Sequence, residues 1–508
     1  MSTPQAEATG GEESSPRIST IAGTGAAGFK GENESAVSAQ LNGPYDMAVD
    51  STGALYFSDY SNHRVRKIAT DGKISTIAGT GTAGVAGDGG QATKAQLNCP
   101  RQIAVDSTDA VYVADSGNHR IRKVTAEGGI STVAGTGAAN SAGDGGPATK
   151  AQLNRPFGLA FASSGAFYIA EYGSNRVRRV TADGNISTIA GTGTAGVAGD
   201  GGPAIKAQLK TPYAVAVDDT GAVYIADSGN ERIRKVTAEG EISTVAGTGV
   251  AGSGGDGGPA TKAQLNRPYG IALDSSGSLY ISEYGSNRVR KVTADGNIST
   301  VAGTGAAGSA GDGAPATKAQ LNQPFGVAVD CVDALYIADH KNHRIRKVAS
   351  AVMAGLPESG TVASFANVRS RLRMGVLRES TRDGAEIHQS LASPRAHQRW
   401  RLIASGQDDG EVLYRIENLR SGKVLEVVGG GTVDGAVVAQ RAYEGSDAEH
   451  QQWRLIPVGS VTDTPRVYEI ANRNSGLLLR VETNAPTVIK QYGAQGDHRD
   501  RQWQLLPV

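Results

Sequence analysis

A repeat of 56 residues dominates the first part of the chain and limits its fold more than any other feature. The triplet Ile-Ser-Thr begins at positions 18, 74, 130, 186, 242 and 298, so neighbouring copies are always 56 residues apart. The same interval separates Pro44, Pro100, Pro156, Pro212, Pro268 and Pro324, and also Arg64, Arg120, Arg176, Arg232, Arg288 and Arg344. Six copies without an insertion or a deletion predict one supersecondary unit repeated six times.

Each copy contains four short apolar runs separated by turn signals. In the second copy they are Ile103–Val105, Ala110–Ala114, Ile121–Val124 and Ile130–Ala134. Val, Ile and Tyr dominate these runs, which are too short for helices, so we expect four antiparallel strands in each unit. Four-stranded units arranged radially form a β-propeller. Glycine makes up 69 of the 508 residues, and its periodic placement fits the many tight turns of such a fold rather than disorder.

The phase of the repeat predicts how the ring closes. Ile18–Ala22 matches an outer strand but precedes the first inner strand, whereas the last unit, Pro324–Val348, has three runs and lacks its fourth. We expect Ile18–Ala22 to complete the last blade, which leaves no open sheet edge at the closure. The prediction is a six-bladed β-propeller over residues 15–350.

The repeat resembles the NHL repeat. The fifth copy contains Pro268-Tyr-Gly-Ile-Ala-Leu-Asp274 followed by Leu279-Tyr-Ile-Ser-Glu283, and the same pattern recurs in the other copies over about 18–350. The resemblance implies a propeller with a central channel. It does not imply one activity, because the family includes binding scaffolds, RNA binders and some lyases, so the function has to be argued from the site.

Two sets of acidic residues recur with the repeat. One set, Asp59, Asp115, Glu171, Asp227, Glu283 and Asp339, precedes an arginine by five positions, and we interpret it as structural ion pairs that hold the turn between the second and third strands. The other set, Glu32, Asp88, Asp144, Asp200, Asp256 and Asp312, lies in the loops between blades. Each loop offers one carboxylate, too few for calcium, which takes six to eight oxygen ligands. We instead predict a turn and a short helix, Pro147–Leu153 in the third copy, with Lys94, Lys150, Lys206, Lys262 and Lys318 on its solvated side.

Two further positions supply the candidate ligand-binding residues of the propeller. Directly after the six prolines come Tyr45, Arg101, Phe157, Tyr213, Tyr269 and Phe325. These side chains either stack on a sugar or peptide at the channel entrance or plug the channel as core. The residue after the first acidic set is Tyr60, Ser116, Tyr172, Ser228, Tyr284 or His340. Duplication of a two-blade unit explains why tyrosine alternates there, and the three tyrosines are also a candidate binding surface on one face.

Nothing in the propeller sequence predicts catalysis. Propeller lyases and lactonases hold a metal with His, Asp or Glu around the axis. Here the starts of the inner strands carry no histidine and one carboxylate, Asp46. His63, His119, His340 and His343 lie in the turn after the second strand, and no nucleophile–base pair is evident. We therefore predict no enzyme, no metal site and no cofactor.

A different repeat follows at the C-terminus. We interpret residues 351–361 as a linker and residues 362–508 as a second domain. Three tryptophans are spaced by 53 and 50 residues, at Trp400, Trp453 and Trp503. They end the similar tripeptides Gln-Arg-Trp, Gln-Gln-Trp and Arg-Gln-Trp. This repetition predicts a shared core with pseudo-three-fold symmetry. This pattern resembles the ricin-B-type β-trefoil over about 362–508, a family that commonly binds galactose-type or xylan-type sugars.

The sugar-binding residues that this resemblance implies are only partly present. The aspartate that grips sugar hydroxyls in the family is replaced by Gly375, Glu426 and Arg480 in the three lobes. The middle lobe alone keeps an acid, an aromatic residue and a polar partner, so the predicted carbohydrate site consists of Glu426, Tyr443, His450 and Gln451. The alternative is a trefoil that binds no sugar.

The bulk properties limit the partners. Lys and Arg number 50, as do Asp and Glu, so the net charge is zero and we expect no nucleic-acid partner. No apolar run approaches the roughly 20 residues that span a bilayer, so we expect no membrane insertion.

Residues 1–14 are predicted to be a disordered tail without a signal peptide, so we expect a cytoplasmic chain, with non-standard export left open. Cys99 and Cys331 occupy non-equivalent positions, so we expect no disulfide.

The sequence thus predicts an all-β chain, a six-bladed β-propeller plus a C-terminal β-trefoil, that acts as a non-enzymatic binding protein. It would recognise carbohydrate, or a cell-surface or protein ligand, through a rigid propeller face and a weak trefoil sugar site. Two alternatives remain: a protein–protein adaptor without sugar binding, and a propeller lyase or hydrolase with a targeting trefoil. The oligomeric state is not predicted.

Overall fold

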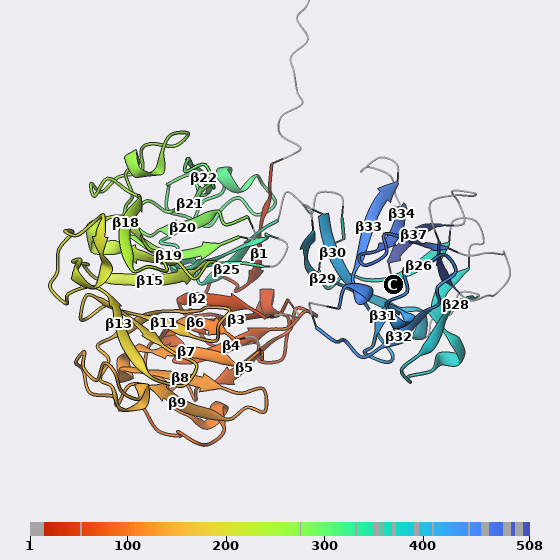
Figure 1. Cartoon of the computed structure of the whole chain (residues 1–508), viewed down its shortest axis with the longest axis horizontal. Coiled ribbons are helices and arrows are strands. Elements are labelled where there is room, and N and C mark those ends of the chain that lie inside the picture. The colour runs from red at the N-terminus through yellow and green to blue at the C-terminus, as the bar shows by residue number, and fades with distance from the viewer. Residues whose placement is uncertain are drawn as a thin grey trace, which may run out of the picture. The chain divides into compact units, whose positions relative to one another are not determined.

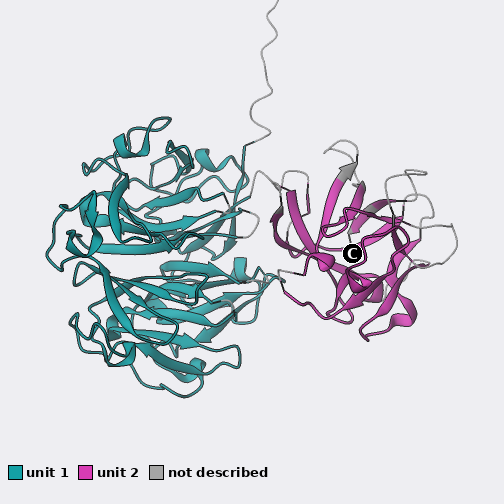
Figure 2. Cartoon of the chain, viewed as in Figure 1, with its two compact units in different colours: residues 1–349 teal, residues 350–508 magenta. Residues whose placement is uncertain are grey.

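The computed structural model consists of two compact units, residues 1–349 and 350–508 (Figure 2). It describes residues 15–507 with gaps at 51–52, 107, 275, 331–332, 350–355, 358, 368–371, 391–395, 409–410, 446–447, 459–466, 481–488 and 493–500. The predicted disordered tail, residues 1–14, lies outside the described residues. Among those described, no helix combines the length and the apolar character needed to cross a bilayer.

The first unit is a ring of six four-stranded antiparallel sheets, as predicted (Figure 1). The inner strands are β2 (Pro44–Val49), β6 (Pro100–Val105), β10 (Pro156–Phe161), β15 (Pro212–Val217), β19 (Pro268–Leu273) and β23 (Val327–Val329). The second strands are β3 (Leu55–Asp59), β7 (Val111–Asp115), β11 (Phe167–Glu171), β16 (Val223–Asp227), β20 (Leu279–Glu283) and β24 (Leu335–Asp339). The third strands are β4 (Arg64–Ile68), β8 (Arg120–Val124), β12 (Arg176–Val180), β17 (Arg232–Val236), β21 (Arg288–Val292) and β25 (Arg344–Val348).

The outer strands show that the ring closes as predicted. They are β5 (Ile74–Ala78), β9 (Ile130–Ala134), β13 (Ile186–Ala190), β18 (Glu241–Ala246) and β22 (Ile298–Ala302), with β1 (Ile18–Ala22) in the sixth blade. β1 pairs antiparallel with β25, and Ile18 lies opposite Val348. A two-residue strand, β14 (Gly202–Pro203), adds to the edge of the fourth blade.

The loops between blades each contain the predicted short helix, reduced to one 3-10 turn. These turns are η1 (Ala36–Ser38), η3 (Ala92–Lys94), η5 (Ala148–Lys150), η6 (Ala204–Lys206), η8 (Ala260–Lys262) and η9 (Ala316–Lys318). The first alanine of each turn is buried, and the lysines are exposed, as expected. The loop between the first two blades packs Ala92, Ala95 and Leu97 among apolar residues of both blades. The loops therefore supply part of the core that joins one blade to the next.

The repeated acidic residues form buried ion pairs, but the predicted arginine partner was wrong. Asp115 pairs with Arg122, seven positions on, at 3.3 Å between Oδ2 and NH1. Arg122 also reaches Asp88 of the inter-blade loop at 3.0 Å. The arginine five positions on, Arg120, donates instead to the carbonyl of Thr136 at 2.9 Å. Arg120 and Arg122 lie two residues apart on one strand, so both project from the same face of the sheet.

The same arrangement recurs in all six blades. The buried arginines are Arg66, Arg122, Arg178, Arg234, Arg290 and Arg346, each between a blade carboxylate and a loop carboxylate. Their side chains are at most 1% exposed. The inter-blade acidic residues therefore act as structural partners of these arginines.

A second contact links each blade to the next. It starts from one residue in the turn after the second strand, which has a positive φ, such as His119 at 55°. The Nδ1 atom of His119 accepts a hydrogen bond from the backbone N–H of Arg155 in the next blade at 3.1 Å. The equivalent acceptors are His63, Asn175, Glu231, Asn287 and His343. We refer to these six hydrogen bonds as the blade clamps.

The second unit is a closed six-stranded barrel with three hairpins. The barrel strands are β26 (Val362–Asn367), β29 (Trp400–Asp408), β30 (Glu411–Asn418), β33 (Trp453–Val458), β34 (Val467–Asn472) and β37 (Gln502–Pro507). The hairpins are β27 (Arg373–Val376) with β28 (Ala385–Ser390), β31 (Val424–Val427) with β32 (Val438–Arg441), and β35 (Leu478–Arg480) with β36 (Lys490–Tyr492). This is the architecture of a β-trefoil.

The three tryptophans occupy equivalent core positions, as predicted. Each is fully buried. The indole N–H of Trp400 donates to Met374 O, that of Trp453 to Leu425 O, and that of Trp503 to Leu479 O, at 3.1, 2.9 and 3.0 Å. Pro357, within the predicted linker 351–361, also contacts this unit, because Tyr414 Oη donates to Pro357 O.

Candidate functional site

The residues that follow the six prolines meet on the propeller axis and fill it. Tyr45, Phe157, Tyr213 and Phe325 are between 5% and 9% exposed. The rings of Tyr213 and Tyr269 stack with centroids 3.8 Å apart, and those of Tyr45 and Phe325 with centroids 4.3 Å apart. Of the two interpretations open at the sequence level, the packing supports a plug of core residues.

Arg101 is the charged member of this plug. Its guanidinium carbon lies 3.6 Å from the ring centroid of Phe157 and 4.6 Å from that of Tyr45. The same guanidinium donates hydrogen bonds to the hydroxyls of Tyr45 and Tyr213. Burial raises the pKa of both tyrosines, which keeps them neutral. Among the described residues, the cation is therefore stabilised by aromatic faces and hydroxyl oxygens rather than by a carboxylate.

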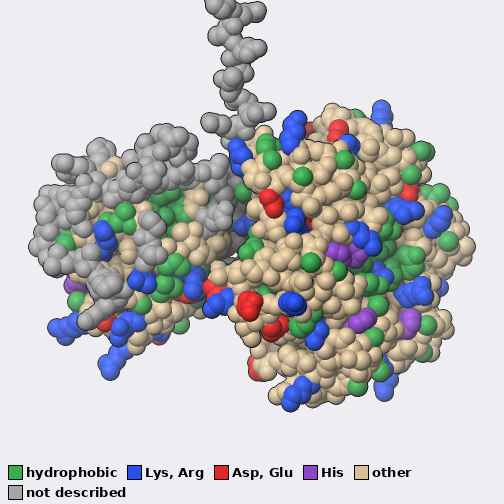
Figure 3. Space-filling view, turned by 180° about the vertical axis from the view of Figure 1, so that it is seen from behind, with side chains coloured by type: hydrophobic (Ala, Val, Ile, Leu, Met, Phe, Trp, Pro, Cys, Tyr) green, Lys and Arg blue, Asp and Glu red, His purple; other side chains and the backbone are tan. Residues whose placement is uncertain are grey.

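A partly exposed layer covers the plug. Tyr60 stacks on Tyr45 at 5.3 Å, Tyr172 on Phe157 at 4.3 Å, and Tyr284 lies 4.8 Å from Tyr269. Figure 3 shows a propeller face on which hydrophobic side chains gather beside histidines, while basic side chains are scattered singly among uncharged ones. The stacking contacts and partial exposure of Tyr60, Tyr172 and Tyr284 make them an aromatic rim over the plug, and their role in ligand binding stays a prediction.

His340 occupies the rim position of the sixth blade. Its ring centroid lies 4.4 Å from that of Phe325, and burial lowers its pKa to about 4. His340 Nδ1 lies 3.1 Å from Pro44 O. The imidazole is therefore neutral at physiological pH and packs against the plug as a partly exposed rim residue.

The space beneath the plug is too small for a substrate. A cavity of about 10 Å³ lies there, no larger than one water molecule requires. Asp46, the single axial carboxylate, is 4% exposed, and burial raises its pKa to about 8. Its Oδ2 accepts a hydrogen bond from Ile103 N of the next inner strand, as Gln102 Oε1 does from Leu159 N. Asp46 therefore joins neighbouring blades.

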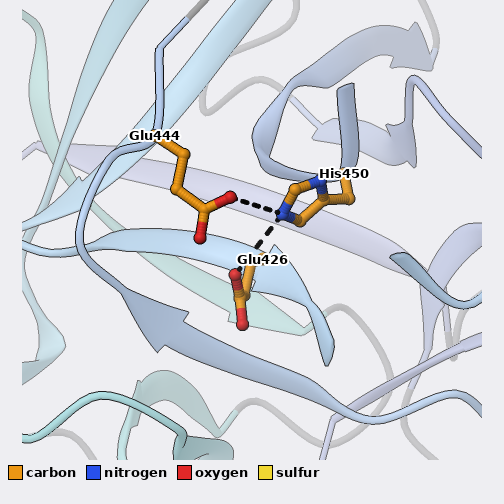
Figure 4. Close-up of side chains that lie close together, drawn as sticks. All are labelled: Glu426, Glu444 and His450. Carbon is orange, nitrogen blue, oxygen red and sulfur yellow. Dashed lines mark ion pairs between the residues drawn. The ribbon is translucent and has the colours of Figure 1, made fainter. Parts of the chain in front are cut away.

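In the trefoil, the middle lobe brings together three of the four predicted sugar-site residues, Glu426, His450 and Gln451. Figure 4 shows Glu426 and His450 with a further acid, Glu444. The side chain of Glu426, on β31, is 1% exposed. Its Oε1 accepts from Arg441 Nε at 2.8 Å and its Oε2 from Gln451 Nε2 at 3.2 Å. His450 Nε2 lies 3.7 Å from Glu426 and 3.6 Å from Glu444. Glu426 forms the base of this polar cluster, and the side chains of Arg441, Glu444 and His450 are 41%, 49% and 24% exposed.

The fourth predicted residue, Tyr443, has a different environment. The guanidinium of Arg415 lies 4.5 Å from its ring centroid. One face of the ring is therefore already covered by a cation. Sequence reasoning chose Tyr443 and missed Glu444, because the family resemblance directs attention to an aromatic residue at this point and not to a second acid.

The cluster also has the donor types of a metal site. One oxygen each from Glu426 and Glu444 and one nitrogen from His450 lie within 4.8 Å of one another, the one such group of three among the described residues. Zinc accepts such donors. However, Arg441 already pairs with Glu426, and three ligands leave a tetrahedral site incomplete. The geometry thus describes a polar recognition surface better than a metal centre.

The other two lobes lack the acid. In the first lobe, a Cβ on Gly375 would come within 2.9 Å of Gln398 Cγ, so a side chain at this position would clash. In the third lobe, Arg480 occupies the position. The described part of the trefoil therefore carries a carboxylate at this position only in its middle lobe.

Comparison with known proteins supports the same two modules. The family model of the teneurin NHL domain matches residues 81–142, 193–253 and 249–310. The model of the ricin-type β-trefoil lectin domain-like family matches residues 352–441 and 396–492.

Individual relatives match the propeller over part of their own length. Teneurin-4 of Mus musculus is 32% identical over 291 residues, which is 48% of this chain and 10% of that protein. A solved structural-genomics protein of unknown function from Bacteroides thetaiotaomicron is 19% identical, with a TM-score of 0.50 over 66% of this chain and 76% of the other, and shows the fold alone. A streptogramin B lyase is 16% identical, with a TM-score of 0.40 over 62% of this chain and 95% of the other, too distant to transfer an activity.

Proposed function

We propose that this chain, an NHL-repeat propeller followed by a ricin-type β-trefoil, is a non-enzymatic binding protein whose trefoil recognises carbohydrate through its middle lobe. The two modules support a binding or adaptor protein. The finer assignment to carbohydrate rests on one observation, the polar cluster around Glu426 in the lobe that retains the acid.

The geometry suggests that the residues of this cluster have different roles. Both oxygens of Glu426 accept hydrogen bonds within the protein, so Glu426 orients Arg441 and Gln451. Glu444 and His450 are more exposed and offer a carboxylate and an imidazole to sugar hydroxyls. A glutamate replaces the family's aspartate and is already engaged, so we expect weak binding. A dissociation constant in the millimolar to high-micromolar range corresponds to about −4 to −6 kcal/mol.

Calorimetric titration of the full chain with simple galactosides and xylo-oligosaccharides tests the proposal. We expect binding that is lost in Glu426→Ala and at least several-fold weaker in Glu444→Gln, because each removes a charged partner of the cluster. Arg480→Ala changes the equivalent position of the third lobe and should leave binding unchanged. If no sugar binds, the carbohydrate assignment fails.

If no sugar binds, the second candidate function is that of a protein–protein adaptor. The observation that favours it is the aromatic rim of Tyr60, Tyr172 and Tyr284 over a rigid plug, together with the similarity of the propeller to teneurins. Aromatic side chains are enriched in protein interfaces. The combined substitution of the three tyrosines by serine, which two other blades carry at this position, should then abolish capture of a protein partner.

A further inference from the structure

Five blades share a group of three residues near the hairpin of their first two strands. An aspartate directly follows the first strand, a tyrosine lies on the second strand, and a lysine lies on the third. Lys123 is 3.2 Å from Asp106, and its ammonium lies 5.0 Å from the ring centroid of Tyr112. The equivalent lysine–aspartate distances are 3.6 Å for Lys67 and Asp50, 3.2 Å for Lys235 and Asp218, and 2.7 Å for Lys291 and Asp274. In the sixth blade, Lys347 lies over Tyr336, and Tyr336 Oη donates to Asp330.

The aspartate also holds the hairpin turn. The Oδ1 atom of Asp106 accepts a hydrogen bond from the backbone N–H of Ala110 at 3.0 Å. The same bond occurs in the other four of these blades, at Asp50, Asp218, Asp274 and Asp330. The carboxylate is therefore part of the local fold as well as the partner of the lysine.

The third blade departs from this arrangement at two of the three positions. Ala162 replaces the aspartate, Arg179 replaces the lysine, and Tyr168 is retained. Among the described residues, Arg179 makes no ion pair or ring contact, and its Nε is buried without a hydrogen-bond partner. The third blade therefore lacks the aspartate of this group but keeps a cation, Arg179. A guanidinium can bind a carboxylate with two parallel hydrogen bonds.

Arg179 lines a groove between the third and fourth blades. The groove has a volume of about 600 Å³ and is also lined by Tyr168, Ile189, Pro203 and Ile205. Ile205 is 56% exposed, at a position that holds threonine in four other blades. The groove therefore combines an apolar wall with a guanidinium that makes no ion pair among the described residues, although Asp219 and Glu239 also line it.

We propose that this groove binds an organic monocarboxylate with an apolar body, whose carboxylate takes the place of the missing aspartate beside Arg179. The fork of the arginine would hold the two carboxylate oxygens, and the apolar body would lie against Ile189 and Ile205. Asp219 and Glu239 line the same groove, so a polyanion such as phosphate would meet two negative charges. This site is independent of the trefoil and of the aromatic rim.

The sixfold repeat supplies an unusually direct test. Ala162→Asp restores the arrangement of the other five blades, so it should neutralise Arg179 and, through the turn hydrogen bond, raise the melting temperature. We would titrate the full chain with 4-phenylbutyrate, and with 4-phenylbutanol and inorganic phosphate as matched probes. We expect 4-phenylbutyrate to bind the parent chain at least ten-fold more tightly than either matched probe.

The variants separate the proposal from a general loss of structure. Ala162→Asp and Arg179→Gln should each weaken 4-phenylbutyrate binding at least ten-fold, the former in a more stable protein. Lys123→Gln, the matched change in the second blade, and Glu426→Ala in the trefoil should leave it unchanged. Absence of binding to the parent chain, equal binding of the alcohol or of phosphate, or unchanged binding by Ala162→Asp would overturn the proposal.

Discussion

At the scale of single residues, the six buried arginines show how charge is stabilised inside this propeller. Burial raises the pKa of Asp115 to about 6, while Asn118, the backbone N–H of Asn98 and the charge of Arg122 favour its ionised form. Arg122 in turn lies between Asp115 and Asp88. A buried ion pair contributes little net stability compared with an apolar pair, but removing one partner leaves a buried charge.

We therefore expect Arg122→Met to destabilise the propeller by about 3–5 kcal/mol, because Asp115 would stay buried without its cation. All three tryptophans lie in the trefoil, so their fluorescence follows the trefoil, and differential scanning calorimetry is needed for the propeller. The control is Arg120→Met, which removes a partly exposed arginine bound to a carbonyl and should cost about 1 kcal/mol. Equal losses in the two variants would contradict this account.

The sequence predicted that these acids are structural but not which arginine they meet. Six equal copies argue against a site, and this inference was correct. Arg120 and Arg122 recur with the same period and project from the same face, so spacing alone could not distinguish them. The choice depends on the direction of each long side chain, and only the structure shows that Arg120 turns toward Thr136.

At the scale of elements, the blade clamps connect the turn of one blade to the residue directly before the first strand of the next. Three of the six acceptors are histidines, His63, His119 and His343, and each accepts through Nδ1. An imidazole nitrogen can accept a hydrogen bond only when it is unprotonated. Burial lowers the pKa of all three below the ordinary value of 6.5.

These clamps should weaken in acid. Above pH 6.5 the three histidines are neutral in the folded and the unfolded chain, so the clamps contribute in full. As the pH falls below 6.5, the unfolded chain takes up protons before the folded chain does, and stability is lost as the pH passes through the lowered pKa values of the folded state. We expect a loss of at most about 1 kcal/mol for each clamp, because the three histidines are partly exposed and solvent screens the effect, measured calorimetrically between pH 8 and pH 5.

The repeat itself supplies the control for this prediction. Asn175 and Asn287 form the same clamp with a group that does not titrate, so the triple variant His63→Asn, His119→Asn and His343→Asn should keep the clamps at every pH. Buried carboxylates with raised pKa values, such as Asp227, change stability in the opposite direction, but they do so equally in both proteins. An identical pH dependence of the two proteins would exclude the histidines as its cause.

The elements themselves were predictable to within a few residues because apolar runs and turn signals repeat six times. The role of the clamp position was not, because His, Asn and Glu alternate there and look like variation in a turn. These residue types share a side-chain acceptor atom that reaches the same backbone N–H of the next blade. This shared property cannot be recognised from the residue types alone. The sequence did not decide whether the axial residues plug the channel or line its entrance, because the distances between the six side chains depend on the radius of the ring.

At the scale of the whole molecule, the ring is held by the pairing of the two ends of the propeller. β1 supplies the outer strand of the sixth blade, and Ile18 and Ala22 are fully buried. The same segment binds the preceding loop, since Ile18 N donates to Ala314 O and Ile18 O accepts from Gly313 N. Removing this segment therefore exposes an edge of β25 and releases a loop of the fifth blade.

Deletion of residues 1–24 should accordingly destabilise the propeller by several kcal/mol, because it removes a strand, its buried apolar side chains and the contacts of a neighbouring loop. Deletion of residues 1–14 is the matched control and should be nearly neutral, because that stretch of sequence carries no apolar run to bury. Calorimetry of the full chain follows the propeller, and tryptophan fluorescence should show that the trefoil transition is unchanged in both deletions. If the longer deletion leaves the melting temperature of the propeller unchanged, the ring does not depend on β1 for its closure, and the five complete blades with their clamps would have to hold it without a sixth outer strand.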